Sequence, residues 1–420
     1  MSGALGMDMR SDGRTDMQTE VQGAALGSSE ANAPGQSTAL FRSFFMGGFE
    51  CTSFRHNDGR RLDLLQSTRH DVHAAHDYLA LQRRGIRSVR DGVRWHRIET
   101  SPGYYDWSSF LPMLRAASHT GTQPIWDVFH YGWPDGLDIW SPAFVERFAR
   151  FAGALAQVVR YETDEQPFYC PINEISFMSW AAGEMGHFYP RCVGCGPEMK
   201  RQLVRASIAA IDAIRGVAPN ARIVQAEPIY QVYPQCPKDA DEAAVQYRAQ
   251  YEACDMLIGK LAPELGGAPA YLDILGVNYY SYNQWFLNGR TIFLGDPLYR
   301  PFRQLLAQAW QRYRRPIFIA ETGAEGDQRA SWFNYVCDES FAAMDAGVPL
   351  EGICMYPVTD YPGWDNDRHC ETGLLGYAGP DGAREVCSSL ADALVAQQLR
   401  RLPAGTPGKV LEFADLRVVP

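Results

Sequence analysis

Two glutamates in this 420-residue chain stand where they could do acid–base chemistry together. Glu174 and Glu321 each directly follow a short run of apolar residues. In a pair of carboxyl groups, one can protonate a leaving oxygen while the other attacks the carbon to which that oxygen is bound, as in glycoside hydrolysis. The alternative is that each glutamate only caps a helix or pairs with an arginine. We favour the paired role because both residues occupy the same place after an apolar run.

Other polar and aromatic side chains follow further apolar runs and are candidates for the same site. They are Arg55, Arg90, His130, Asn173, Asn278, Tyr280 and Trp364. No serine stands in a GxSxG elbow, no HExxH or HxH pattern suggests zinc, and no glycine-rich phosphate-binding loop follows an apolar run. We therefore expect a reaction that needs neither a metal nor a cofactor.

The elements that position these residues alternate regularly along the chain. Eight nearly continuous apolar runs are typical of strands buried on both faces of a parallel sheet: Phe44–Phe49, Ile86–Arg90, Thr122–Phe129, Pro167–Asn173, Arg222–Glu227, Leu272–Tyr280, Pro316–Ala320 and Gly352–Pro357. Between and after them lie eight helical patterns: Leu64–Arg84, Ser108–Ser118, Pro142–Tyr161, Pro197–Arg215, Asp241–Leu261, Pro301–Arg314, Arg329–Ala346 and Ala383–Leu399. This alternation predicts an α/β fold, a (β/α)₈ TIM barrel, whose active site lies at the carboxyl ends of the strands. A doubly wound open sheet has the same alternation, but the missing nucleotide motifs make it the weaker alternative.

The barrel is expected to be a single domain over residues 41–405. Residues 1–40 contain no Phe, Trp, Tyr or Ile, and such a segment cannot bury enough apolar surface to offset its ordering entropy, so we predict a disordered tail there. Residues 406–420 form a C-terminal extension.

The net charge and the composition of the chain argue against nucleic acid and membranes as partners. The net charge of −10 leaves no broad basic face for nucleic acid, and the longest apolar stretches are too short to cross a membrane. With no apolar signal segment at the N-terminus, the expected location is cytoplasmic. Among ten cysteines, only Cys192 and Cys195 form a CxxC pair, and we expect a loop disulfide or two free thiols rather than a metal site.

Five segments resemble, in order, motifs of the family 1 glycoside hydrolases, the β-glucosidase-like enzymes of clan A. Residues 88–98 resemble RFSISWSRI, 128–134 (VFHYGWP) LYHWDLP, 171–175 (PINEI) TFNEP, 275–280 (LGVNYY) IGLNYY, and 319–323 (IAETG) ITENG. Each match is weak alone, whereas the ordered set is specific for the clan.

The resemblance implies a role for each matching residue. It makes Glu174 the acid/base and Glu321 the nucleophile of a retaining double displacement, with Arg90 and Tyr280 beside the nucleophile; Asn173 would bind the sugar 2-hydroxyl, His130 another hydroxyl, and Asn278 is the amide of the sixth strand. Arg90 could instead be a structural ion pair, and His130 a hydrogen-bonded core residue.

The sugar-binding positions depart from the family. Arg55 falls where the family has a glutamine, and Gly363 where it has the glutamate that binds the 4- and 6-hydroxyls. Tyr356 replaces a tryptophan, Trp364 is kept, and Ile175 replaces the proline of NEP. Because this exchange adds positive charge, an anionic or differently substituted sugar could gain a charge-assisted bond from Arg55, and unsubstituted β-glucosides are expected to be poor substrates.

Two functional alternatives stay open on the sequence. A pseudo-glycosidase would bind a saccharide or glycoconjugate without turnover, and a transglycosylase would use the same two glutamates. The sugar, the aglycon and the oligomeric state are not determined. Glu227 could contact a ligand or be structural, and His70, His73 and Asp77 are expected on a solvated helix face rather than around a metal.

Overall fold

Eight parallel strands close into a barrel in the computed structural model, which describes residues 39–56 and 58–401. Around the barrel the order is β1 (Phe45–Gly48), β12 (Leu350–Met355), β11 (Ile317–Thr322), β9 (Ile274–Asn278), β7 (Arg222–Pro228), β6 (Phe168–Cys170), β5 (Gln123–Asp127) and β2 (Ser88–Gly92). Closure excludes the doubly wound open sheet, so the predicted (β/α)₈ barrel is confirmed. The predicted N-terminal tail lies outside the described residues apart from its last two positions, and the predicted C-terminal extension lies wholly outside them.

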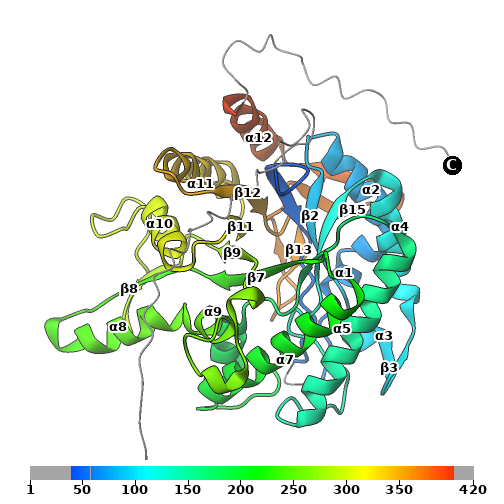
Figure 1. Cartoon of the computed structure of the whole chain (residues 1–420). Coiled ribbons are helices and arrows are strands. Elements are labelled where there is room, and N and C mark those ends of the chain that lie inside the picture. The colour runs from blue at the N-terminus through cyan, green and yellow to red at the C-terminus, as the bar shows by residue number, and fades with distance from the viewer. Residues whose placement is uncertain (1–38, 57, 402–420) are drawn as a thin grey trace, which may run out of the picture. The chain divides into compact units, whose positions relative to one another are not determined.

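Helices surround the strands (Figure 1). They are α1 (Leu64–Ser67), α2 (His70–Gln82), α3 (Trp95–Ile98), α4 (Leu111–Thr120), α5 (Pro142–Glu162), α6 (Ile175–Met178), α7 (Gly196–Val217), α8 (Ala240–Ala249), α9 (Glu252–Leu257), α10 (Phe302–Tyr313), α11 (Gln328–Asp345) and α12 (Ser388–Arg400). No helix of the described residues is long and apolar enough to cross a membrane.

The strands are apolar on both faces because each face packs against something. Met46, Ile125 and Phe318 belong to a cluster that fills the barrel interior. Their chain neighbours Trp126 and Ile319 belong to the larger cluster shared with the helices. Alternate strand residues point to opposite faces, so a continuous apolar run is what this arrangement requires.

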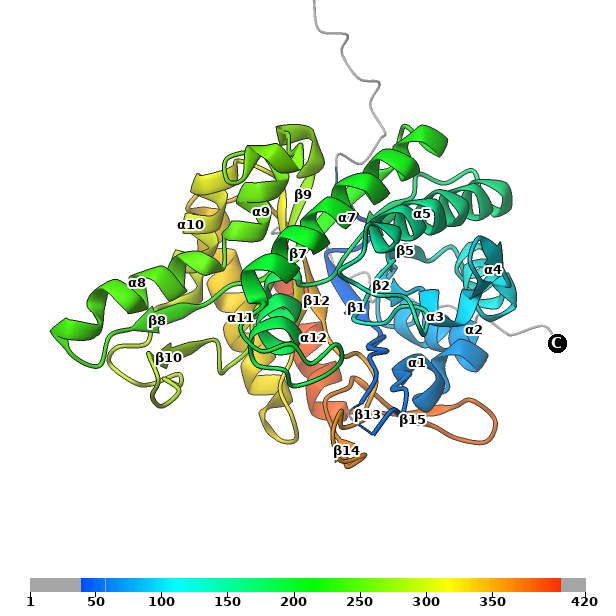
Figure 2. The ribbon, with the colours of Figure 1, turned by 90° about the horizontal axis from the view of Figure 1, so that it is seen from below.

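Short elements outside the barrel were not predicted. They pair as β3 (Glu99–Ser101) with β4 (Tyr104–Tyr105), β8 (Gln231–Tyr233) with β10 (Gln284–Phe286), β13 (Tyr361–Pro362) with β14 (His369–Cys370), and β15 (Leu375–Ala378) with β16 (Arg384–Val386). The predicted helix Asp241–Leu261 is two helices, α8 and α9. In Figure 2, α8 lies with β8 and β10 to one side of the barrel.

The expected solvated face on α2 is wrong, because His70, His73 and Asp77 are all buried. His70 Nδ1 lies 2.7 Å from Asp77 Oδ2, and His70 Nε2 lies 2.9 Å from Asp91 Oδ2. Arg384, next to the C-terminal helix, closes the cluster by donating to Asp77 Oδ1 at 2.6 Å. A buried charge needs such partners, and sequence spacing alone did not reveal them.

Candidate active site

A cavity of about 880 Å³ opens at the carboxyl ends of the barrel strands. Glu174, just after β6, and Glu321, near the end of β11, both line it. Tyr356, just after β12, packs over Gly48 of β1 so closely that an added Cβ there would lie 2.2 Å from the ring. The missing side chain therefore lets an aromatic ring form part of the cavity wall.

Glu321 is held by one cation and one phenol. Arg90 Nη1 donates to Oε1 at 2.8 Å, and the Tyr280 hydroxyl donates to Oε2 at 2.9 Å. Burial raises the pKa of Glu321, and the charges of Arg90 and His130 oppose that rise. Of the two glutamates, this is the one whose ionised form is directly stabilised by a cation.

Glu174 is instead surrounded by neutral donors. The Tyr131 hydroxyl donates to Oε2 at 2.7 Å and Asn278 Nδ2 to Oε1 at 2.9 Å. Burial, followed by the charge of Glu321, raises the pKa of Glu174 to about 8. A carboxyl with such a pKa keeps its proton at neutral pH and can act as a general acid.

The backbone is unusual at both residues of the hydrogen bond between Tyr131 and Glu174. Glu174 has φ 46° and Tyr131 has φ 65°, in the left-handed region that residues other than glycine rarely adopt. The turn after Glu174 is held by Glu227, whose Oε2 accepts from Ser176 N at 3.0 Å. Burial raises the pKa of Glu227 to about 7. Glu227 is thus positioned to fix the backbone that carries Glu174.

Arg90 links the two halves of the site. Its guanidinium is fully buried, and Nη2 donates to Asp127 Oδ2 at 2.6 Å and to Asn173 Oδ1 at 2.9 Å. The Asn173 amide nitrogen lies 3.2 Å from His130 Nε2, and His130 Nδ1 lies 3.1 Å from Asp127 Oδ2. Arg90 therefore forms an ion pair with Asp127 inside the barrel and a second one with Glu321.

The structure brings together all but one of the site residues named from the sequence. Arg90, His130, Asn173, Asn278 and Tyr280 join the two glutamates in one hydrogen-bond network, and Trp364 lines the same cavity.

Arg55 is the exception. Its guanidinium lies 3.3 Å from Asp135 and 5.7 Å from the ring centroid of Tyr189, and the residue lines a separate small pocket. The structure thus places Arg55 beside Asp135 and outside the residues that line the cavity, and its part in sugar binding stays a prediction.

Three side chains of the site were not assigned a role from the sequence. Glu50, five residues before Arg55, lines the cavity; Tyr131 bonds Glu174; and Asp127 bonds Arg90. The positions of Glu50 and Tyr131 just after apolar runs were a usable signal. Asp127 lay inside a predicted strand, where a continuous apolar run does not show which side chains point inward.

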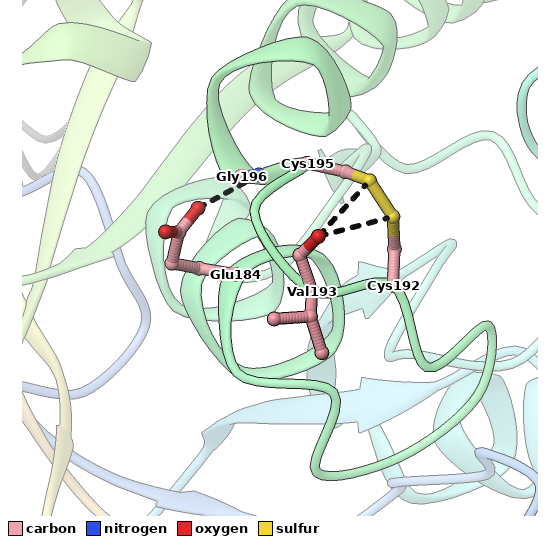
Figure 3. Close-up of a disulfide and its surroundings, with 5 residues drawn as sticks. All are labelled: Glu184, Cys192, Val193, Cys195 and Gly196. Carbon is pink, nitrogen blue, oxygen red and sulfur yellow. Dashed lines mark hydrogen bonds between the residues drawn. A yellow bond between two sulfur atoms is a disulfide. The ribbon is translucent and has the colours of Figure 1, made fainter.

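Two tryptophans and the start of α7 form another part of the cavity wall. Trp180 and Trp285 line it, whereas Trp126 and Trp133 are buried in the core. The wall there is the start of α7, preceded by the loop in which Cys192 and Cys195 form a disulfide (Figure 3). Gly196 N donates to Glu184 Oε2 at 3.2 Å and ties this loop to the cavity wall.

One group of the described residues approaches the geometry of a metal site. Cys51 Sγ, Asp127 Oδ2 and His130 Nδ1 lie within 4.8 Å of one another, all buried. Hydrogen bonds account for these contacts, and Asp127 already carries the guanidinium of Arg90. A second cation beside Arg90 would meet electrostatic repulsion, so this donor set does not fit a resident metal ion.

Known proteins share the fold at low sequence identity. No protein-family model and no curated protein sequence matches the chain. A hyperthermophilic β-glucosidase superposes with a TM-score of 0.68 at 16% identity, covering 84% of this chain and 99% of its own. The β-glucosidase of Thermotoga maritima bound to deoxynojirimycin gives 0.68 at 14% identity, covering 85% and 97%. The family 1 β-glucosidase from the same organism gives 0.67 at 14% identity, covering 86% and 97%. The chain therefore has the fold of these β-glucosidases.

Proposed function

We propose that the protein is a retaining glycoside hydrolase in which Glu174 is the acid/base and Glu321 the nucleophile. The observation that carries the proposal is the contrast between the two carboxyl groups in one cavity. Glu321 is bound by Arg90, while Glu174 is bound only by neutral donors and has a pKa of about 8. Two carboxyl groups with different environments are what acid and nucleophile roles require.

In the first step, Glu174 gives its proton to the glycosidic oxygen as Glu321 attacks the anomeric carbon. The bond to the leaving group breaks, and a covalent glycosyl-enzyme forms on a carboxylate oxygen of Glu321. Arg90 and Tyr280 hold the two oxygens of Glu321 separately, which fixes the direction of attack. In the second step, Glu174 takes a proton from water, and this water displaces Glu321 with net retention.

Azide rescue tests the two roles. Glu321→Ala is expected to abolish hydrolysis of every nitrophenyl glycoside, and azide should restore turnover as a glycosyl azide of inverted configuration. Glu174→Ala should spare the first step for substrates with good leaving groups, since a general acid contributes about 10²–10⁴-fold mainly where protonation is needed. Nuclear magnetic resonance of the products reports both configurations. Equal losses in both variants, without rescue by azide, would mean that the residues are structural.

A further inference from the structure

Glu50 is a buried carboxylate in the cavity without a close cation. Its side chain is only 5% exposed and lines the cavity, and Oε1 accepts from two neutral donors, Thr52 N at 3.0 Å and the Tyr356 hydroxyl at 3.5 Å. Among the described residues, the cationic group found near it is His130, whose Nε2 lies 3.9 Å from Oε1. A buried carboxylate with so little compensation is expensive unless something else neutralises it.

The charges around Glu50 do not balance. Asp127 and Glu321 share Arg90, and Asp127 also takes the Nδ1 contact of His130. With His130 protonated, three carboxylates face two cations, so one negative charge is left over. Glu174 is not counted here, because its proposed role requires that it hold a proton.

The remaining carboxylates of the cavity have partners of their own. Lys200 Nζ lies 2.6 Å from Glu252, and Arg368 Nη2 donates to Glu325 at 2.9 Å. Glu184 accepts from a backbone nitrogen and is partly exposed, so water can screen its charge. Among these carboxylates, Glu50 is therefore the buried one whose charge is left without a cation of its own.

The other buried cluster of the barrel shows the contrast. Asp77 and Asp91 face His70 and Arg384, two carboxylates against two cationic side chains. This cluster lines no cavity described for the chain. The excess of negative charge therefore occurs in the cavity, where a ligand can enter. In the cluster around His70, the carboxylates and the cationic side chains are equal in number.

Aromatic side chains line the same cavity as Glu50. Tyr282, Tyr356, Tyr361 and Trp364 all line it. The negative charge of Glu50, after burial, is a cause of the raised pKa of Tyr356 and Tyr361, so these rings lie within its field. Aromatic rings together with a carboxylate attract an ammonium group more strongly than a neutral hydroxyl.

We infer, on the basis of the proposed glycosidase function, that the cavity selects a sugar carrying a protonated amino group, with Glu50 as its counter-ion. The ammonium donates charge-assisted hydrogen bonds to the Glu50 carboxylate and cancels the excess negative charge. A hydroxyl donates one bond to the same oxygen and leaves the charge in place. The sugar inferred here is cationic, whereas Arg55 led to the expectation of an anionic sugar. The difference arises because Glu50 lines the cavity and Arg55 does not.

A panel of nitrophenyl β-glycosides tests this specificity on the full chain. It contains the β-glucoside, analogues in which one hydroxyl at a time is an amine, and their N-acetyl derivatives, assayed at about pH 6, where an alkylamine is protonated. At least one amino glycoside is expected to exceed the glucoside in kcat/KM by about tenfold or more, and its N-acetyl derivative to lose that advantage.

Glu50→Gln removes the charge at nearly constant volume. The ratio of kcat/KM between amino and neutral glycosides is expected to fall by about 10- to 100-fold in this variant, the range of a charge-assisted hydrogen bond. Glu325→Gln is the matched control, because Glu325 lines the same cavity but is paired with Arg368, and it should leave the ratio unchanged. If Glu50→Gln does not fold, the preference of the wild type decides the question.

The outcomes separate the two proposals. Hydrolysis of the neutral glucoside at least as efficient as that of every amino analogue would overturn the inference and leave the glycosidase function standing. If no glycoside is cleaved, the proposed function fails, and calorimetric binding of methyl amino glycosides against methyl glucoside then decides the inference by itself. Equal ratios in wild type and Glu50→Gln would also overturn it.

Discussion

The residues around the two glutamates set how each responds to pH. Glu174 accepts hydrogen bonds from Tyr131 and Asn278, and both bonds stabilise its ionised form and lower its pKa against burial and the charge of Glu321. Because a general acid must be protonated, kcat/KM should fall as the pH rises through about 8. The alkaline limb of the pH–rate profile thus reports this one carboxyl group.

Tyr131→Phe should move that alkaline limb to higher pH. The variant removes a donor to the carboxylate, so the pKa of Glu174 should rise, by about 0.5–1 unit for a hydrogen bond worth roughly 0.5–1.5 kcal/mol. The measurement is kcat/KM against pH for a nitrophenyl glycoside. Tyr230→Phe is the control, because Tyr230 lines the same cavity but donates to Gln246 O. An alkaline limb that moves down or stays in place would contradict the assignment of Glu174.

The sequence predicted single residues well where a chemical group follows a regular strand. Asn278 and Glu321 lie at the ends of buried strands and Glu174 follows one, and their inward direction follows from that place. After β1 the chain is irregular, so spacing could not decide whether Glu50 or Arg55 enters the cavity. The partner of Arg55, Asp135, is distant in sequence, and only the folded chain shows the contact.

At the scale of elements, the buried cluster on α2 joins three parts of the chain. His70 lies on α2, Asp91 on β2 and Arg384 on β16, and Phe49 stacks on His70 with ring centroids 3.5 Å apart. Burial would lower the pKa of His70, but Asp91 and Asp77 outweigh it and raise the pKa to about 9. The protonated imidazole therefore stabilises the fold.

This cluster predicts how stability depends on pH. A histidine with a raised pKa contributes stability that is complete below its unfolded value of about 6.5 and is lost as the pH rises through about 9, in total about 3 kcal/mol. His70→Gln should lower the free energy of unfolding at neutral pH and remove most of the decline between about pH 7 and 9.5. Urea unfolding at several pH values measures both effects. The exposed His119→Gln is the control, and an unchanged decline in His70→Gln would show that another group causes it.

The barrel strands were predicted correctly and some elements outside the barrel were not, and the difference has a physical reason. The eight barrel strands follow from continuous apolar runs, and the structure places each within a few residues of its predicted range. The break between α8 and α9 and the pair β8–β10 lie outside the barrel, where partial exposure removes a clear apolar pattern. His70 and Asp77 were assigned wrongly for another reason. Polar residues in a helix are buried only when partners compensate them, and their partners Asp91 and Arg384 lie on other elements.

At the scale of the whole molecule, the barrel brings residues from seven strands to one site. Glu50 follows β1, Arg90 lies in β2, His130 follows β5, Glu174 follows β6, Glu227 lies in β7, Asn278 in β9 and Glu321 in β11. Parallel strands all end at the same edge, so the chain can concentrate charged groups there. Arg90 can reach Glu321 across the barrel because closure places the second and seventh strands of the chain around one interior.

The closed barrel predicts that residues 1–38 are dispensable for activity. The residues proposed for catalysis lie outside this segment, and its lack of Phe, Trp, Tyr and Ile leaves little apolar surface to bury. A chain that begins at residue 39 should keep the kcat/KM of the full chain, with a free energy of unfolding changed by no more than about 0.5 kcal/mol. Limited proteolysis of the full chain should cut first within residues 1–40, because their composition predicts a segment that does not fold, and such a segment fits a protease more readily than a packed barrel does. A large loss of kcat/KM on truncation, or protection of this segment from proteolysis, would show instead that it packs on the barrel and belongs to the folded domain.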